Sequence, residues 1–336
     1  MYPSKIHSPS RPGRNATKRF LTILFAVTAC YSWLHGQVSS SVTFDSSTGN
    51  YVIRFQGAEG IVETVFEPST KVRPHIQCVV LRDRDSGRLL YYYTVRNGNG
   101  ARQRLITFSV DHKTQINDLE APNHQWTADI IGTRRLASWS HSRVDPHGVL
   151  TSFNGIPSDS AASGFSFRSA GLPTIVFSYS EGAAKTVYFP EEPPLDVDSL
   201  LDPLEIFPRN SVSQTTVGPK QPEEAFDKTA FLDTLLSYTR QSAQLGWLGR
   251  IRDDDCDDDE RPDDGVVRNI ENRLQKARRE LVRGDSVKAR RELEKLIRKV
   301  DRLQRRGERV MTGEAYALLK YNTEYLIERL PERRRR

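Results

Sequence analysis

The stretch "IQCVVLRDRDSGRLLYYYTV", residues 76–95, decides the fold of the first half of the chain. Apolar side chains recur at every second position on both sides of a short polar turn, which predicts two antiparallel strands. Gly87 supplies the positive φ that a tight hairpin loop demands. One face of the second strand then holds Leu89, Tyr91, Tyr93 and Val95. We expect that face to lie in a core.

The same alternation continues over residues 41–190, where Gly, Pro, Asn and Asp separate the runs and no helical period intervenes. It is seen in "RLITFSV" (104–110), "SGFSFRS" (163–169), "TIVFSYS" (174–180) and "KTVYF" (185–189). Short strands divided by turn residues favour an antiparallel β-sandwich over a parallel α/β sheet. We therefore predict a sandwich over residues 38–190, with Trp126 and Trp139 as structural aromatics in its core.

Three motifs of this region resemble the immunoglobulin-like sandwich modules of secreted bacterial proteins. They are "YYYTVRNG" (91–98), "SGFSFRSAGLP" (163–173) and "FSYSEG" (177–182). The resemblance covers about a third of the chain and its motifs are structural, so it implies a fold and little about activity.

A change of character follows at residues 191–222, which mix prolines, acids and small polar residues. Proline fixes φ and lacks an amide hydrogen, so we expect a linker that belongs to neither sheet nor helix. Beyond it, over 223–331, apolar residues recur every three or four positions, which predicts an all-α domain of four helices. The predicted helices cover about 224–245, 266–283, 286–306 and 313–330. The sandwich and the helices should have two independently buried interiors.

The helical part has a Gly-Trp after the first helix, an Arg-Gly-Asp turn before a long third helix and a Leu-Ile near the end. The residues at these places include Gly246, Trp247, Gly284, Leu293, Leu326 and Ile327. In these features the helical part resembles the C-terminal FIMAH domain of secreted bacterial proteins. The resemblance implies a non-catalytic appendage or interaction module. This chain departs from the family in an acidic insertion between the first two helices and in a third helix rich in Arg and Lys.

That insertion is "RDDDCDDDERPDDG", residues 252–265. As a calcium loop beginning at Asp253 it has Asp258 where an EF-hand places its turn-forming glycine and Asp264 where it places a bidentate glutamate. We interpret it as a hydrated, mutually repelling loop, with weak Ca²⁺ binding as the alternative. The ligands would then be Asp253, Asp255, Asp257 and Asp259. No other cofactor is expected.

Residues 266–336 carry 22 Lys and Arg against 11 acidic residues, although the whole chain has a net charge of only +6. One interpretation is a solvated surface of ion pairs, because Glu280, Glu292, Glu294 and Glu328 have basic neighbours one turn away. The other is a contact surface for an anionic envelope component or another protein. Its candidate residues are Arg290, Arg291, Arg298, Lys299, Arg302, Arg305 and Arg306. Specific nucleic-acid recognition is not expected. The tail 332–336 is also basic.

The N-terminus reads as an export signal, with a basic region before the apolar "FLTILFAV" (20–27). The apolar stretch is about 15 residues, short of the roughly 20 of a membrane-spanning helix. We predict a cleavable signal peptide over 1–37. The alternatives are a lipoprotein acylated at Cys30 in "VTAC" (27–30) and an uncleaved anchor. All three interpretations predict an exported protein, which would be secreted or periplasmic, or else anchored to the membrane.

After cleavage Cys78 and Cys256 remain, and we expect two free thiols, with a disulfide as the alternative. The single cluster that invites a catalytic interpretation is "HSRVDPHG" (141–148), where His141, Asp145 and His147 would hold a metal if the loop folded back. Asp-Pro before Gly is also an ordinary turn between strands. No other catalytic motif is found.

The resulting hypothesis is an exported, non-catalytic protein that binds or scaffolds at the bacterial cell envelope. Two alternatives stay open. One is a metal-dependent hydrolase with its site near His141 and His147. The other is an accessory module that binds polysaccharide through exposed aromatic residues.

Overall fold

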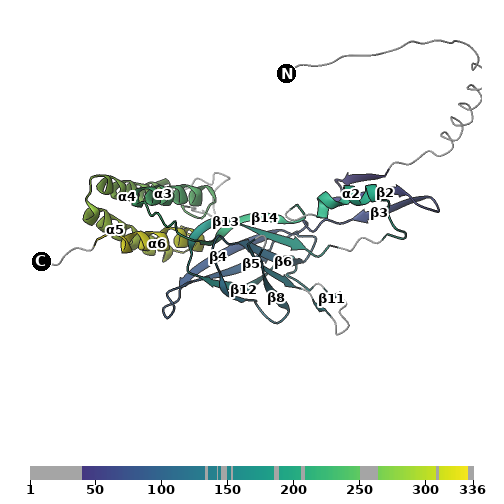
Figure 1. The fold of residues 1–336 in the computed structure, drawn as a ribbon, viewed down its shortest axis with the longest axis horizontal. Helices are drawn as coiled ribbons and strands as arrows, with labels where there is room; N and C mark the ends of the chain where they lie inside the picture. Colours follow the sequence, from purple (N-terminus) through teal and green to yellow (C-terminus); the bar gives the residue numbers. More distant parts are fainter. Residues whose placement is uncertain are drawn as a thin grey trace, which may run out of the picture. The chain divides into compact units, whose positions relative to one another are not determined.

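The computed structural model describes residues 40–132, 135–141, 143–144, 150–152, 154–184, 189–205, 209–249, 264–307 and 310–331. They divide into two compact units (Figure 1). The smaller unit comprises residues up to Val65 and Val187–Leu201. The larger unit comprises Phe66–Thr186 and Asp202 to the C-terminal end, and it holds both the sandwich and the helical domain.

The smaller unit is a three-stranded sheet of β1 (Ser41–Asp45), β2 (Asn50–Gln56) and β3 (Ile61–Phe66), with α2 (Leu195–Glu205) beside it (Figure 1). Ile53 and Phe55 of β2 are fully buried, and the Phe55 ring lies 6.1 Å from that of Phe189. The Glu191 carboxylate accepts a hydrogen bond from the Ala58 amide. Residues 189–201 thus return to pack against this sheet.

The larger unit contains an antiparallel β-sandwich, which confirms the predicted fold class. One sheet has the order β4 (Pro74–Arg82), β5 (Leu89–Asn97), β12 (Ser160–Ser169), β7 (Asn117–Glu120). The other has the order β14 (Val212–Lys220), β13 (Leu172–Gly182), β6 (Leu105–Asp111), β9 (Leu136–His141), β8 (Trp126–Ile131). A short hairpin of β10 (Arg143–Val144) and β11 (Leu150–Ser152) lies outside both.

Aromatic side chains fill the space between the two sheets. The predicted inward face of β5 is buried throughout, since Leu89, Tyr91, Tyr93 and Val95 are at most 3% exposed. Trp139 of β9 is fully buried and stacks on Phe108 of β6, with ring centroids 5.4 Å apart. Its indole nitrogen donates to the Glu120 carbonyl, so the polar end of the ring is also satisfied.

The expectation that residues 191–222 form a linker is wrong, because α2 and β14 lie within this range. β14 pairs with β13 along its whole length, from Leu172↔Lys220 to Ser180↔Val212. Pro219 is tolerated there because β14 is an edge strand. On the side of an edge strand that faces no other strand, a missing amide hydrogen costs no hydrogen bond between strands. The expected single sandwich over 38–190 is likewise too long, because β1–β3 form a separate sheet.

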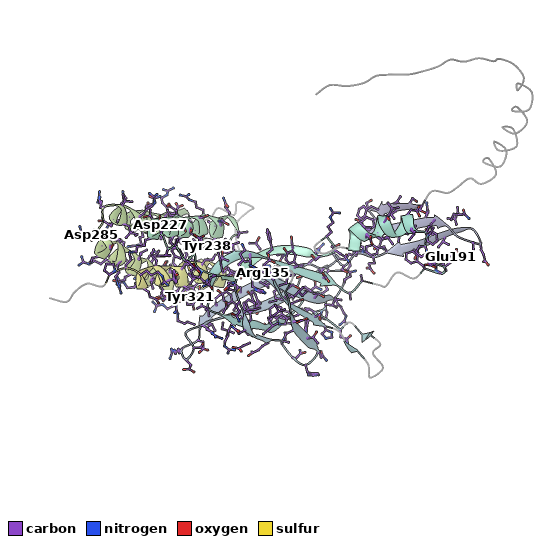
Figure 2. All side chains as sticks on the ribbon, in the orientation of Figure 1. Arg135, Glu191, Asp227, Tyr238, Asp285 and Tyr321 are labelled. Atoms are coloured by element: carbon purple, nitrogen blue, oxygen red, sulfur yellow. The ribbon has the colours of Figure 1, made fainter. Side chains whose placement is uncertain are left out.

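The four predicted helices are present as α3 (Lys228–Gln244), α4 (Asp264–Val282), α5 (Ser286–Gln304) and α6 (Gly313–Glu328). Asp227 caps α3 by accepting from the Thr229 and Ala230 amides, and Asp285 caps α5 by accepting from Lys288 (Figure 2). Leucines from all four helices form their common core, together with Ile270, Val300, Met311 and Ile327. Among the helices of the described residues, none is long and apolar enough to cross a membrane.

The prediction of two independent interiors is wrong, because α6 belongs to both. Ala315 and Leu319 of α6 lie in the helical core, whereas Ala317, Leu318 and Tyr321 lie in the core of the sandwich. The amphipathic pattern alone predicts one buried face. It could not reveal that α6 is apolar on two opposite sides.

Candidate anion-binding surface

The solvent side of α5 and the turn that follows it carry a row of arginines, defined here as the α5 basic face: Arg291, Arg298, Arg302, Arg305 and Arg306. All five are exposed. The opposite side of α5 is buried in the helical core, with Ala289, Leu293, Leu296, Val300 and Leu303. Because positions three, four or seven apart share one side of a helix, Arg291, Arg298, Arg302 and Arg305 lie in line. From Arg291 to Arg305 the row is about 21 Å long at 1.5 Å per residue.

Acidic residues neutralise other cations of the helical domain. Glu292 has a side chain only 8% exposed, and Lys295, Lys276 and Arg273 surround it at 2.9, 3.1 and 3.7 Å. Glu280, Glu294 and Glu328 pair with Arg283, Arg290 and Arg329. This part of the surface follows the predicted pattern of ion pairs.

The α5 basic face differs, because none of its five guanidinium groups forms an ion pair within the described residues. Arg305 donates to the backbone carbonyl of Asp301 at 3.3 Å, and no carboxylate of the described ranges lies at ion-pair distance from it. A row of positive charges that are not held in close ion pairs attracts anions and concentrates them near the surface. These five groups are therefore available to contact an anionic partner.

Two of the seven predicted contact residues are placed differently. Arg290 donates to the carbonyl oxygen of Leu330 at 2.9 Å and pairs with Glu294 at 3.2 Å. It therefore stabilises the end of α6, where carbonyl groups lack helical partners. Lys299 is half-buried. The sequence could not separate these two from their neighbours, because all seven share one charge.

Hydrogen bonds also govern the ionisation of Glu292. Burial of its carboxyl would raise the pKa, but hydrogen bonds from Lys295 and Lys276 and their charges outweigh burial and lower it. The carboxylate thus stays ionised at neutral pH and joins α4 to α5 through its ion pairs with Arg273 and Lys276.

His141, the one described member of the predicted metal cluster, packs as a core residue. Its ring is nearly perpendicular to that of Trp126, with ring centroids 5.3 Å apart, and its Nε2 atom lies 3.4 Å from the Gln125 carboxamide oxygen. Burial lowers the pKa of its imidazole. Asp145 and His147 lie outside the described residues, and so do Asp253, Asp255, Asp257, Asp259, Cys30 and Cys256. Within the described ranges no three His, Cys, Asp or Glu side chains gather as a metal site.

Cys78, on β4, carries a fully buried thiol that lies 3.7 Å from the Val217 carbonyl oxygen. Burial and the nearby Glu314 carboxylate raise its pKa well above the ordinary value. A thiol held in its protonated form makes this cysteine a packing residue of the sandwich.

The larger unit is thus a β-sandwich joined to a small helical domain with an exposed basic face. Residues 254–328 match the family model described as the FIMAH domain, which confirms the resemblance seen in the sequence. The matched range includes α4, α5 and α6, and therefore the whole basic face. No curated protein and no solved structure matches the chain.

Proposed function

We propose that this chain is an exported, non-catalytic binding protein whose α5 basic face attaches it to an anionic component of the bacterial cell envelope. The observation that carries the proposal is the difference between the five arginines of this face and the paired cations around them. A FIMAH match supports a secreted or surface-associated protein. The apolar run of residues 20–27 supports export.

The chemistry of the face indicates the kind of ligand. Guanidinium groups bind phosphate, sulfate and carboxylate through planar, charge-assisted hydrogen bonds. Arg298, Arg302 and Arg305 lie one helical turn apart, about 5–6 Å, and Arg291 lies two turns before Arg298. An extended polymer with repeated anionic groups would contact several of them at once. Such binding should weaken steeply with salt, because each contact releases a counter-ion.

Heparin, as a linear polyanion, provides the test. The double variant Arg298→Ala/Arg302→Ala should bind at least tenfold more weakly at low salt. The slope of log affinity against log salt should fall by about one for each arginine removed. The matched control is Arg84→Ala/Arg88→Ala, which removes the same charge from the turn between β4 and β5. Equal weakening by both double variants would show that net charge, and not the α5 basic face, is responsible.

A second probe distinguishes a polyanionic polymer from phospholipid head groups as the source of the anionic groups. Vesicles of anionic phospholipid, assayed with the same two double variants, test head groups in place of a polymer. Loss of vesicle binding without loss of heparin binding would overturn the preference for an extended polymer. Mass spectrometry of the mature N-terminus tests export itself, since cleavage near Gly36 or acylation of Cys30 gives different masses.

A further inference from the structure

A second feature, a groove of about 290 Å³, lies between the five-stranded sheet and the end of α3. β13, β14 and β6 supply one wall, and Gln241, Gln244 and Leu245 supply the other. Both walls carry an exposed apolar side chain. Phe177 of β13 is 55% exposed and Leu245 is 40% exposed. Two exposed apolar groups facing one hollow are typical of a surface that a ligand covers.

The position of Phe177 follows from strand alternation. Val176 and Ser178 point into the sandwich and are buried, so the ring between them stands on the outer side of the sheet. Its partner on the adjacent strand β14 is Thr215. On the other side lies Asp111 of β6, whose carboxyl is close to the backbone of Phe177 and lines the same groove.

Hydrogen-bonding groups surround the ring. Asp111 offers carboxyl oxygens, Thr215 a hydroxyl, Gln241 and Gln244 carboxamides, and Lys113 an ammonium group. Gln241 already donates to Ser237 within α3 at 2.8 Å, which fixes its orientation. One acid and one base leave the groove without net charge. It therefore differs from the α5 basic face in the ligand that it suits.

These groups match the two sides of a sugar ring. The apolar C–H face of a pyranose packs against an aromatic ring, while its hydroxyl groups both donate and accept hydrogen bonds. Carboxylate and carboxamide side chains satisfy both roles. Burial raises the pKa of Asp111, so this carboxyl already lies in a partly desolvated place where a hydrogen bond gains strength.

We infer that this groove binds an uncharged sugar unit of a glycan, with Phe177 as the stacking platform and Asp111 and Gln244 as hydrogen-bonding partners. The site goes beyond the proposed anion binding. It uses a different surface of the same unit and a different chemistry, so either can exist without the other.

Electrophoresis of the full chain through native gels containing soluble β-glucan, arabinoxylan or galactomannan tests the inference. We expect retardation by at least one of the three, unchanged in 0.5 M salt because no net charge is involved. Phe177→Ala should weaken the apparent affinity at least tenfold, and Gln244→Ala, at an exposed helix end, severalfold. A wild-type chain that none of the three polysaccharides retards would overturn the proposal.

The matched control is Phe44→Ala, which removes a phenyl ring that is 60% exposed on β1, outside the groove. It should be retarded like the wild type. Equal loss of retardation in both phenylalanine variants would indicate non-specific hydrophobic adsorption and would also overturn the proposal. Retardation that disappears in salt and with Arg298→Ala/Arg302→Ala, but not with Phe177→Ala, would assign glycan binding to the α5 basic face instead.

Discussion

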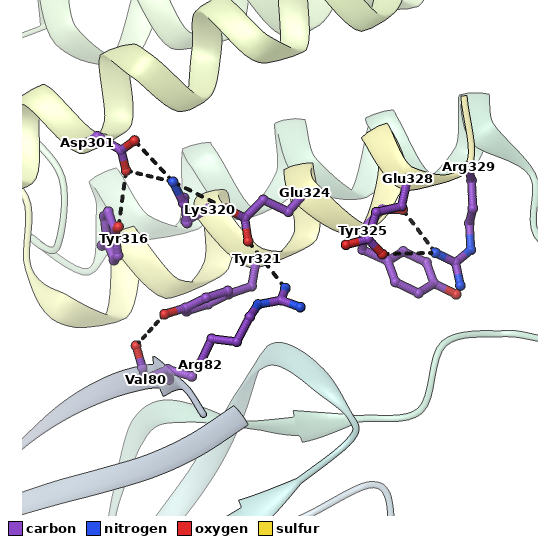
Figure 3. Close-up of polar contacts among 10 residues, drawn as sticks. All are labelled: Val80, Arg82, Asp301, Tyr316, Lys320, Tyr321, Glu324, Tyr325, Glu328 and Arg329. Atoms are coloured by element: carbon purple, nitrogen blue, oxygen red, sulfur yellow. Dashed lines mark hydrogen bonds and ion pairs between the residues drawn. The ribbon is translucent and has the colours of Figure 1, made fainter. Parts of the chain in front are cut away.

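The carboxylate of Glu314, in the first turn of α6, accepts a hydrogen bond from the backbone amide of Cys78 on β4. Both residues are buried. A side chain of the helical domain thus provides the hydrogen-bond acceptor for a buried backbone amide of the sandwich. Further bonds join the same surfaces, since the Tyr321 hydroxyl donates to the Val80 carbonyl and Arg82 pairs with Glu324 (Figure 3). Gly313 permits this approach, because a Cβ there would lie 2.5 Å from the Cys78 carbonyl oxygen.

Removal of that acceptor should therefore destabilise the larger unit. Glu314→Ala leaves the Cys78 amide buried without a partner, which costs about 1–3 kcal/mol of unfolding free energy. Glu314→Gln keeps an acceptor oxygen and should lose less than half as much. Urea unfolding followed by near-UV circular dichroism measures both. Equal losses in the two variants would contradict a role for the hydrogen bond.

The sequence predicted the elements much better than it predicted their assembly. Alternation placed Tyr91 and Tyr93 in the core, and the 3.6-residue period found all four helices, because these patterns depend on local geometry. Proline content misplaced β14, because an edge strand accepts residues such as Pro219 that a central strand does not. The contact of α6 with β4 joins residues more than 200 positions apart, and no local pattern encodes it.

The candidate sites also combine features that the local sequence predicts with features that only the folded chain reveals. Charge density identified α5, but ion-pair geometry was needed to separate Arg290 from Arg298. The groove was missed, although its signal was present. Phe177 lies in the outward register of "TIVFSYS", where an aromatic ring has no core to fill. Its polar partners come from β6, β14 and α3, which only the folded chain brings together.

Arg290 should act on stability, and the α5 basic face on binding. Arg290→Ala removes the hydrogen bond to Leu330 and the pair with Glu294, so we expect a loss of about 1–2 kcal/mol in unfolding free energy. Heparin affinity should change less than twofold. Arg298→Ala should do the reverse, with weaker binding and stability within about 0.5 kcal/mol of wild type. Weakened binding with intact stability in Arg290→Ala would return this residue to the contact surface.

The thiol of Cys78 should resist modification in the folded chain. Its burial excludes reagents, and its raised pKa keeps the reactive thiolate scarce. In a Cys30→Ser/Cys256→Ser variant, Ellman's reagent at pH 8 should react with less than a tenth of the protein within minutes, and with all of it in 8 M urea. Rapid reaction of the native protein would mean that β4 opens at its contact with α6. Peptide mapping of the wild type without reduction tests the predicted free thiol at Cys256.

Acid should weaken the contact between α4 and α5, because protonation of Glu292 removes the negative charge that joins them. Its pKa is lowered in the folded chain, so its ionised form stabilises the fold above the ordinary value of 4.5, and this stabilisation is lost as the pH falls through the lower, folded value. Glu292→Gln should lower the unfolding free energy by about 1–2 kcal/mol at pH 7, because Lys276 and Lys295 lose their buried counter-charge. As the pH falls from 7 to 3, the difference between variant and wild type should shrink, since protonation of Glu292 removes the charge that the glutamine lacks. Glu328→Gln is the control, because its pair with Arg329 is exposed and 3.9 Å long. A deficit of Glu292→Gln that stays the same at both pH values would show that the carboxylate contributes shape and not charge.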